Sequence, residues 1–434
     1  MIKEKIETVP SRLYRWVLLL FVSLLTLGSY FAYDSIGPIA PMLKAQLGIG
    51  SEQIGWMYSI YSLPNLIMVF IGGIILDRIG TRIGALAYAT LVLLGATLTA
   101  SGSYIHQAPF ELPASWTPEF FWMFAGRFLF GLGSESLIIA QSTIIARWFK
   151  GKELALAFGV NLTLCRLGTF AAFNGVSRIA ERFQNIHPAL WLAAMVCLFS
   201  VFTALIYIML EIRAERRHGM RLSEAADRVS LKDIALFKPA FWLVSALCVT
   251  FYSAIFPFTA FSTDFFVEKW GLSQSTGGTL SSIIIFMSMV FTPIFGTLVD
   301  RIGRRATLMI FGSLLMVPAH LILALTHVHP AIPMALLGVS FSLVPAAMWP
   351  SIPYIVDEKR LGTAYGLMTL VQNFGLFLFP ILVGSIRDTT GTYTYGMLIF
   401  STLGIAGVLF ALLLRREERG PRSSGLEGVI LDAE

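Results

Sequence analysis

The chain has 434 residues, of which 56% are hydrophobic and 13% are charged, and its formal net charge is +6. Soluble domains carry about 25% charged and about 45–50% apolar residues, so one water-soluble core would not hold this much apolar surface. The basic residues lie between apolar runs and give no indication of nucleic-acid binding. The composition therefore excludes a soluble globular protein and indicates a chain embedded in a membrane.

Twelve apolar runs follow one another, each about long enough to cross a hydrocarbon layer of about 30 Å as a helix. The predicted spans are 14–41, 53–76, 83–105, 119–148, 153–178, 188–212, 239–266, 274–299, 306–327, 331–355, 362–386 and 394–414. A transmembrane barrel would instead show alternation over about ten residues, which the sequence lacks. We therefore predict an all-α membrane protein with twelve transmembrane helices.

The only sizeable polar stretch between two predicted spans divides the chain into halves. We predict an N-terminal six-helix bundle over residues 1–212, a cytoplasmic linker over 213–238, a C-terminal six-helix bundle over 239–416 and a cytoplasmic tail over 417–434.

The basic residues are distributed asymmetrically between the two sides of this predicted topology. Both termini, the middle segment and the even-to-odd linkers together hold about 25 Lys and Arg side chains, and such an excess marks the cytoplasmic side. The opposite side holds only Lys44, Arg178, Arg182, Lys269 and Arg387. The count thus supports the number of spans and predicts that both termini are cytoplasmic.

Two short patterns recur in the two halves. Residues 73–82, between the second and third spans, and residues 296–305, between the eighth and ninth, both read Gly-x-x-x-Asp-Arg-x-Gly-x-Arg. Likewise, Leu-Ala-Leu-Ala-Phe-Gly at 154–159 aligns with Leu-Gly-Thr-Ala-Tyr-Gly at 361–366. Tandem copies of this kind predict two bundles related by a pseudo-two-fold axis along the membrane normal.

The first of these patterns is similar to the signature loop of the major facilitator superfamily. The resemblance implies two pseudo-symmetric six-helix bundles and a transporter, with a charge cluster that holds the inner gate closed in one state and releases it in another. The gate residues that we predict are Asp77, Arg78, Arg82, Asp300, Arg301 and Arg304. Arg305 is expected beside them at the cytoplasmic surface. The alternative for a single copy is a plain basic turn that sets topology, but two corresponding copies disfavour it.

Charged side chains also occur inside the predicted spans, where ionisable groups are costly and mark functional sites. Glu135 and Arg166 fall near the middle of the fourth and fifth spans. They either pair directly with each other or face a shared cavity as two separate poles, a carboxylate for an ammonium and a guanidinium for a carboxylate. Asp34 and Arg127 fall nearer the outer ends of their spans, where we expect structural or gating roles more than substrate contact.

The repeat also predicts which residues face these charges from the other half. Arg166 aligns with the neutral amides of the eleventh span, so the ionic contacts would lie on one wall and hydrogen-bonding or aromatic contacts on the other. The candidates for this second wall are Tyr252, Phe256, Trp349, Gln372 and Asn373. Each of them is equally compatible with ordinary helix packing.

Longer stretches resemble one branch of the superfamily, the lysosomal dipeptide uniporters among the major facilitator superfamily domain-containing proteins. The stretches are 127–137, 148–159 and 165–168 in the first half, and 349–350, 361–366 and 372–375 in the second. The resemblance implies that Glu135 receives the free amine of a dipeptide and that Arg166 receives its terminal carboxylate. It also implies a chain without a cofactor, whose partners are dipeptides and the lipid bilayer. We expect a monomer.

The sequence differs from the lysosomal members because its N-terminus carries no acidic dileucine motif, which favours a prokaryotic cytoplasmic (inner) membrane over a lysosomal one. The first span lacks the E-x-x-E-R/K motif of proton-coupled peptide symporters, so facilitated diffusion is the leading mode. The alternatives are an organic-anion or monocarboxylate carrier anchored at Arg166, a proton-coupled peptide transporter, and a non-transporting receptor. The histidines form no metal-spaced or triad-like set, so we expect neither an enzyme nor a metal site.

Overall fold

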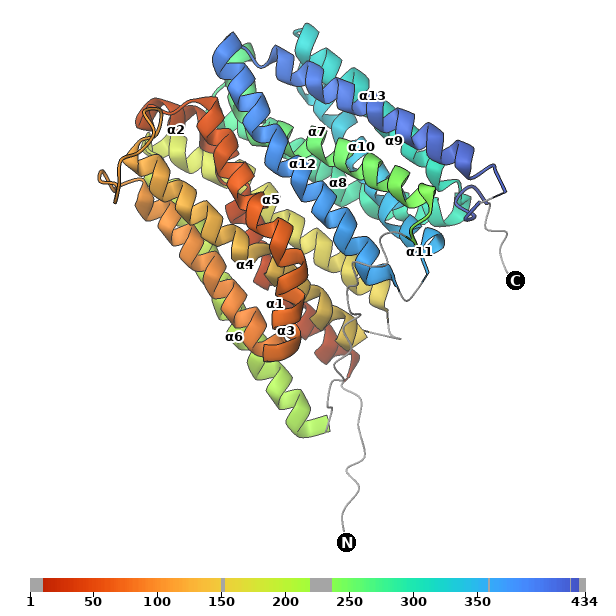
Figure 1. Ribbon diagram of the computed structural model, residues 1–434. Coiled ribbons are helices and arrows are strands. Elements are labelled where there is room, and N and C mark those ends of the chain that lie inside the picture. The colour runs from red at the N-terminus through yellow and green to blue at the C-terminus, as the bar shows by residue number, and fades with distance from the viewer. Residues whose placement is uncertain (1–10, 150–152, 219–235, 358–359, 422, 429–434) are drawn as a thin grey trace.

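The computed structural model describes the chain apart from residues 1–10, 150–152, 219–235, 358–359, 422 and 429–434, and all regular secondary structure in the described part is helical. The helices are α1 (Arg12–Tyr33), η1 (Gly37–Ile39), α2 (Ala40–Leu47), α3 (Ser51–Gly102), α4 (Pro118–Phe149), α5 (Leu154–Phe183), α6 (His187–His218), α7 (Pro239–Trp270), α8 (Gln274–Ile302), α9 (Arg305–Leu325), α10 (Ala331–Met348), η3 (Trp349–Ser351), α11 (Ile352–Ile355), α12 (Leu361–Thr390) and α13 (Thr394–Glu417). They form two groups, α1–α6 and α7–α13, which lie against each other along part of their length (Figure 1). The all-helical prediction is therefore confirmed.

The predicted second and third spans are the two arms of the single long helix α3. The arms meet at Gly80, whose φ of 78° and ψ of 161° break the helical geometry. Glycine adopts such a positive φ without the steric cost that a Cβ imposes. Among the described residues, eleven segments are long and apolar enough to cross a membrane. The first arm of α3 covers the predicted segment 53–76 and is not among these eleven.

Two predicted spans are interrupted near one end. The first long helix ends at Tyr33, and the chain continues through the short helix η1, in which Pro38 occupies an early position. The tenth predicted span ends as α10 at Met348, after which Trp349 and Pro350 begin another short helical turn. Proline has no N–H to donate and constrains the residue before it, which explains both breaks. The breaks were not predicted, and both border the cavity described below.

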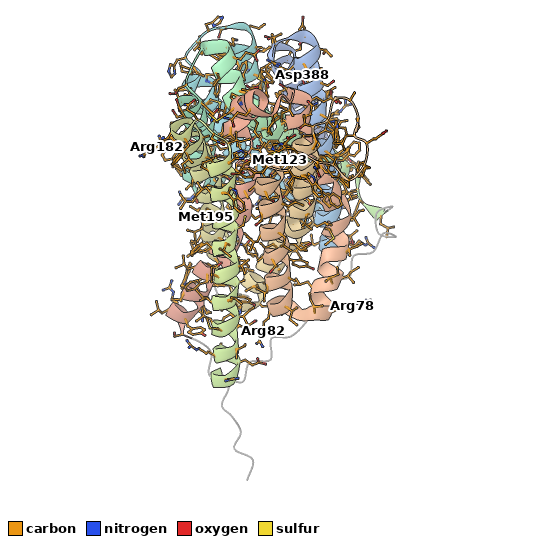
Figure 2. The ribbon with its side chains drawn as sticks, turned by 90° about the vertical axis from the view of Figure 1, so that its left-hand side faces the viewer. Arg78, Arg82, Met123, Arg182, Met195 and Asp388 are labelled. Atoms are coloured by element: carbon orange, nitrogen blue, oxygen red, sulfur yellow. The ribbon has the colours of Figure 1, made fainter. Side chains whose placement is uncertain are left out.

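The two ends of the molecule are distinguished by their charged residues, and we name them here. Arg78 and Arg82 lie at the end that we call the basic end, and Asp388 lies at the opposite end, which we call the far end (Figure 2). Met123 and Met195 lie between these two levels. The loop that contains Arg78 and Arg82, predicted to be cytoplasmic, therefore lies at the end opposite to Asp388.

Helix packing holds each group together and also joins the two groups. Within the groups α3 packs on α4 and α9 on α13, whereas α3 with α12 and α5 with α8 form the contacts between groups. Glycines permit close approach at the α3–α12 contact, where a Cβ added at Gly55 would meet the carbonyl of Pro380. Small residues serve membrane helices in this way because backbones can then approach closely.

A polar network fastens the two bundles at the far end. The Lys44 ammonium, from α2, contacts the Asp264 carboxylate of α7 at 2.6 Å, and the two side chains are only 16% and 6% exposed. Asp264 also accepts a hydrogen bond from the hydroxyl of Tyr393. Asp388 accepts hydrogen bonds of 2.9 and 2.8 Å from the first backbone N–H groups of α3, at residues 51 and 52. An acidic group is stabilised at a helix N-terminus, so Asp388 of the second bundle caps a helix of the first.

Candidate functional site

A cavity of about 590 Å³ lies between the two bundles. Helices α1, α3, α4 and α5 line it from the N-terminal bundle, and α7, α8, α10 and α12 line it from the C-terminal bundle. This volume lies in the range of about 300–1,000 Å³ that small-molecule sites occupy. The cavity therefore has room for a small organic solute.

The cavity opens toward the basic end. Its lining includes Gly159 near the start of α5 and Pro350 after the end of α10, and both residues are exposed. By contrast, the lining residues Asp34 and Thr259 are buried, with exposed fractions of 5% each. The fastened far end and this difference in exposure together describe a chamber that is more accessible from the basic end than from the far end.

Glu135 lies in the wall of this cavity on α4. The hydroxyl of Tyr61 lies 3.4 Å from its Oε1 atom and 3.1 Å from the Ser134 hydroxyl, and it donates its single proton to one of these two acceptors at a time. A Tyr hydroxyl that donates to a carboxylate fixes its orientation while leaving its other lone pairs free for a further donor. Glu135 is thus oriented and retains capacity to bind an ammonium group.

Arg166 lies in the same cavity on α5. Its Nη1 atom donates to the Thr292 hydroxyl of α8 at 3.2 Å, and its guanidinium carbon lies 4.8 Å from the centre of the Phe341 ring. Among the described residues neither Arg166 nor Glu135 forms an ion pair, with each other or with any other side chain. Of the two arrangements left open by the sequence, the structure therefore shows separate poles in one chamber, with no direct ion pair.

Arg127 has a structural role in this arrangement. It is 2% exposed, and its guanidinium donates to three backbone carbonyls, those of residues 57, 32 and 33, at 3.0–3.2 Å. Four aromatic rings surround the same guanidinium at 5.2–5.7 Å, and they belong to Tyr33, Tyr58, Tyr61 and Phe130. Satisfied donors and cation–π contacts offset the cost of burying the charge. Because Tyr61 belongs to this cluster, Arg127 also holds the ring that contacts Glu135.

Asp34 is the third charged residue of the cavity wall. It is the C-cap residue of α1, at the break before η1, and Thr169 of α5 lines the cavity with it. The sequence indicated a structural or gating role, and the structure adds that the residue lines the chamber. The chamber is therefore lined by two carboxyl groups and one guanidinium among the described residues.

The second wall is largely aromatic. The indole N–H of Trp349 donates to the Tyr252 hydroxyl at 2.8 Å, and the Tyr252 ring stacks on Phe256 with centroids 5.7 Å apart. These three residues and Gln372 all line the cavity. Asn373 does not line it. Its side chain donates to the Thr369 carbonyl at 3.0 Å and accepts from Asn65 of α3 at 3.5 Å, at the contact between the bundles. Four of the five predicted second-wall residues therefore meet at the chamber.

The predicted gate residues lie at the basic end, and the two copies of the loop make different contacts there. Arg82 forms ion pairs with Glu211 and Glu215 of α6 at 2.8 and 2.7 Å, within its own bundle. Arg78, Arg301 and Arg304 are exposed. Asp300 is 74% exposed and lies 3.4 Å from an Arg305 nitrogen. The side chain of Asp77 lies outside the described part of the structure.

Arg305 corrects one prediction. We expected it at the cytoplasmic surface, but its side chain is 4% exposed. It donates to the Tyr354 hydroxyl at 3.3 Å, and its guanidinium carbon lies 4.7 Å from the centre of that ring. The aromatic neighbour and the nearby carboxylate draw the guanidinium inward, which pattern matching alone does not reveal.

The residues of the far-end network were missed because no sequence signal joins them. Lys44 and Asp264 are 220 positions apart, and both are near the ends of apolar segments, where charged residues are common. The only available signal was an aspartate inside the predicted span 239–266.

Comparison with known proteins places this geometry in context. The family model described as Major Facilitator Superfamily matches residues 22–267 and 243–429. The protein named lysosomal dipeptide transporter MFSD1 is 34% identical in Danio rerio, covering 92% of this chain and 87% of the relative, and 33% identical in Homo sapiens, covering 95% and 89%. A crystal structure of a mutant of the nucleoside transporter NupG superposes with a TM-score of 0.72 at 16% identity, covering 92% of this chain and 99% of the other.

Proposed function

The chain belongs to the Major Facilitator Superfamily, and we propose that it carries dipeptides across the membrane as a uniporter that works by alternating access. It is a multi-pass membrane transporter of this superfamily, and its relatives are transporters without enzymatic chemistry. The observation that carries the proposal is that Glu135 and Arg166 line one chamber without forming an ion pair.

The chemistry of a dipeptide complements these two poles. A dipeptide at neutral pH carries an ammonium at one end and a carboxylate at the other, and its ends are about 7 Å apart in an extended chain. A planar guanidinium binds a carboxylate through two parallel hydrogen bonds, and a carboxylate accepts from an ammonium. Glu135 therefore takes the amine and Arg166 the carboxylate. The aromatic wall formed by Tyr252, Phe256 and Trp349 accommodates side chains of varied shape.

The names of the relatives supply independent support. Proteins named lysosomal dipeptide transporter MFSD1 from several vertebrates share 32–34% identity over most of this chain. Uniport is proposed because the first span has no E-x-x-E-R/K motif. Alternating access is supported by the chamber, which opens toward the basic end while the far end is fastened.

We further propose that the basic end faces the cytoplasm and that the membrane is a prokaryotic cytoplasmic membrane. The positive-inside rule supports this orientation. Fractionation and protease protection of the termini test it, because accessible termini in right-side-out vesicles would contradict it.

Uptake into proteoliposomes tests the function. Wild-type protein is expected to load vesicles with a labelled dipeptide, without a proton gradient, to the concentration outside. Glu135→Gln and Arg166→Lys are each expected to lower uptake at least about tenfold, the cost of about 1.4 kcal/mol for one charged contact. Arg182→Lys is the matched control because Arg182 is exposed and lies outside the cavity. Undiminished uptake in both cavity variants would overturn the proposal.

One observation favours a second candidate, an organic-anion or monocarboxylate carrier. Arg166 has no acidic partner among the described residues and rests on Thr292 and Phe341, so it is free to hold an anion alone. In this case Glu135→Gln would leave uptake unchanged, and carboxylates without an amine would compete with the labelled solute. A proton-coupled peptide transporter, which would use Asp34 or Glu135, would instead concentrate dipeptide when a proton gradient is imposed.

A further inference from the structure

The chain after α13 folds back onto the C-terminal bundle. Glu418 is the C-cap residue of α13 and is 4% exposed. Its carboxylate accepts backbone N–H groups from Ser424 at 3.0 Å and from Leu426 at 3.0 Å. The Leu426 side chain is completely buried. The segment from 418 to 428, apart from residue 422, therefore forms a compact turn, which we call the strap.

The strap meets the start of α9. The N-cap residue of this helix is Arg304, whose side chain makes no capping hydrogen bond. The first N–H groups of a helix need acceptors, and the strap provides two. The Leu426 carbonyl accepts from the N–H of Arg305 at 2.8 Å, and the Glu427 carboxylate accepts from the N–H of Thr307 at 2.7 Å.

Glu427 makes two further contacts that fix it in this position. Its other carboxylate oxygen accepts from the Thr307 hydroxyl at 2.7 Å, and it lies 3.7 Å from the guanidinium Nε of Arg415 on α13. A carboxylate at a helix N-terminus also interacts favourably with the helix dipole. The strap therefore links the beginning of α9 to the end of α13 through charge and hydrogen bonds.

The repeated loop is held by acidic groups in both bundles, but these groups come from different places. In the N-terminal bundle, acidic residues of the last helix, Glu211 and Glu215, hold the loop through Arg82. In the C-terminal bundle Arg305, which aligns with Arg82, turns instead toward Asp300 and Tyr354. The acidic group that comes from beyond the last helix is then Glu427, and it holds the loop through the α9 backbone.

The contact of Arg305 with Tyr354 carries the effect of the strap to the chamber. Tyr354 belongs to α11, and Trp349 and Pro350 of the preceding turn line the cavity near the basic end. The connection therefore runs from the strap through α9 and Arg305 to the wall of the opening.

We propose that the strap is a conformational device that supplies the missing cap of α9 and holds loop 300–305 in register with segment 349–356, whose first two residues line the cavity. The segment predicted as a cytoplasmic tail then acts as part of the gate at the basic end. This inference does not depend on which solute the chamber binds.

Hydrogen–deuterium exchange on the full chain in lipid nanodiscs tests the strap. Glu427→Ala removes the cap, and the amides of residues 305–308 are expected to exchange about 3- to 30-fold faster, the range for losing a helix cap. The amides of 349–356 are expected to accelerate with them, whereas residues 80–86 of the other copy are not. Glu427→Gln keeps an acceptor oxygen, so the exchange rates of amides 305–308 in this variant are expected to lie between those of the wild type and those of Glu427→Ala.

Glu417→Ala is the matched control, because the Glu417 side chain makes no hydrogen bond or ion pair with the described residues and lies at the same helix end. It is expected to leave all three regions unchanged. A chain that ends after Glu417 lacks the whole strap. Its amides at 305–308 are expected to exchange faster than those of Glu427→Ala. Unchanged exchange at 305–308 in Glu427→Ala and in the shortened chain would overturn the strap, and acceleration there without acceleration at 349–356 would overturn its link to the cavity wall.

Discussion

Asp264→Asn is expected to open the far end of the transporter. The Asp264 carboxylate contacts the Lys44 ammonium at 2.6 Å, and the aspartate side chain is 6% exposed. The substitution leaves the ammonium partly buried without a counter-ion, and breaking such a pair costs about 3–5 kcal/mol in buried settings. Lys44 is 16% exposed, so we take the lower limit. A cost of about 3 kcal/mol lowers the ratio of far-end-closed to far-end-open protein about 150-fold.

Thiol labelling measures this shift. The cysteines of the chain, Cys165, Cys197 and Cys248, are buried, so a single reporter can be introduced with a low background. Thr259→Cys places the reporter in the cavity wall, where the native side chain is 5% exposed. In oriented proteoliposomes Asp264→Asn is expected to speed the reaction with an impermeant maleimide added on the far-end side.

The control removes an ion pair that lies at the surface. Asp357 is 75% exposed and contacts Arg360 at 2.9 Å, and such surface pairs contribute about 0–1 kcal/mol. Asp357→Asn is therefore expected to leave labelling of Thr259→Cys unchanged. Equal labelling rates in Asp264→Asn and the parent would refute the reasoning that this ion pair holds the far end closed.

Three further substitutions test other parts of the account. Arg127→Lys loses most of the three hydrogen bonds to backbone carbonyls. It is expected to lower the free energy of unfolding by about 2–4 kcal/mol, which a lower Tm would show. An unchanged Tm would contradict the structural role of Arg127. Tyr61→Phe removes the hydroxyl that contacts Glu135. It is expected to weaken dipeptide binding about 2- to 10-fold with an unchanged Tm. Equal affinity for the dipeptide would show that this hydroxyl does not orient the Glu135 carboxylate. In Gly80→Ala the added Cβ meets no atom within 4 Å. The expected loss of about 1–3 kcal/mol therefore comes from the backbone conformation alone, because φ 78° with ψ 161° is a region that glycine occupies almost exclusively. A Tm equal to the wild type would contradict the kink.

The sequence was most informative where the membrane restricts what a chain can do. A hydrocarbon layer requires long helices with satisfied backbone groups, so apolar runs predicted the helices and their order. Local breaks were not visible at this level. The turn at Trp349 and Pro350 lies inside an apolar run, and only its proline signals that the helix cannot continue unchanged.

The sequence also predicted some residues of the candidate site and not others. Glu135 and Arg166 stood out because charge at bilayer depth is rare, and both line the chamber. The amides of Gln372 and Asn373 are adjacent in sequence, yet only Gln372 lines it, because consecutive residues of a helix point in directions about 100° apart. A repeat alignment is not accurate enough to choose between neighbours.

Contacts between segments that are far apart in the chain could not be predicted from the sequence. Asp388 caps α3 from a position 336–337 residues away, and Glu427 caps α9 from 120 residues away. Both act on backbone N–H groups, which every residue except proline carries. Such partners leave no side-chain pattern at the receiving end and so cannot be found by motif.

Binding of end-blocked dipeptides tests the central claim most directly. The wild type and the variants Glu135→Gln and Arg166→Lys are titrated calorimetrically with a free dipeptide, its N-acetyl form and its C-terminal amide. The account predicts that N-acetylation no longer lowers the affinity in Glu135→Gln and that amidation lowers it less in Arg166→Lys than in the wild type. The reason is that Glu135 binds the amine and Arg166 binds the carboxylate. Penalties of the same size in all three proteins would contradict it.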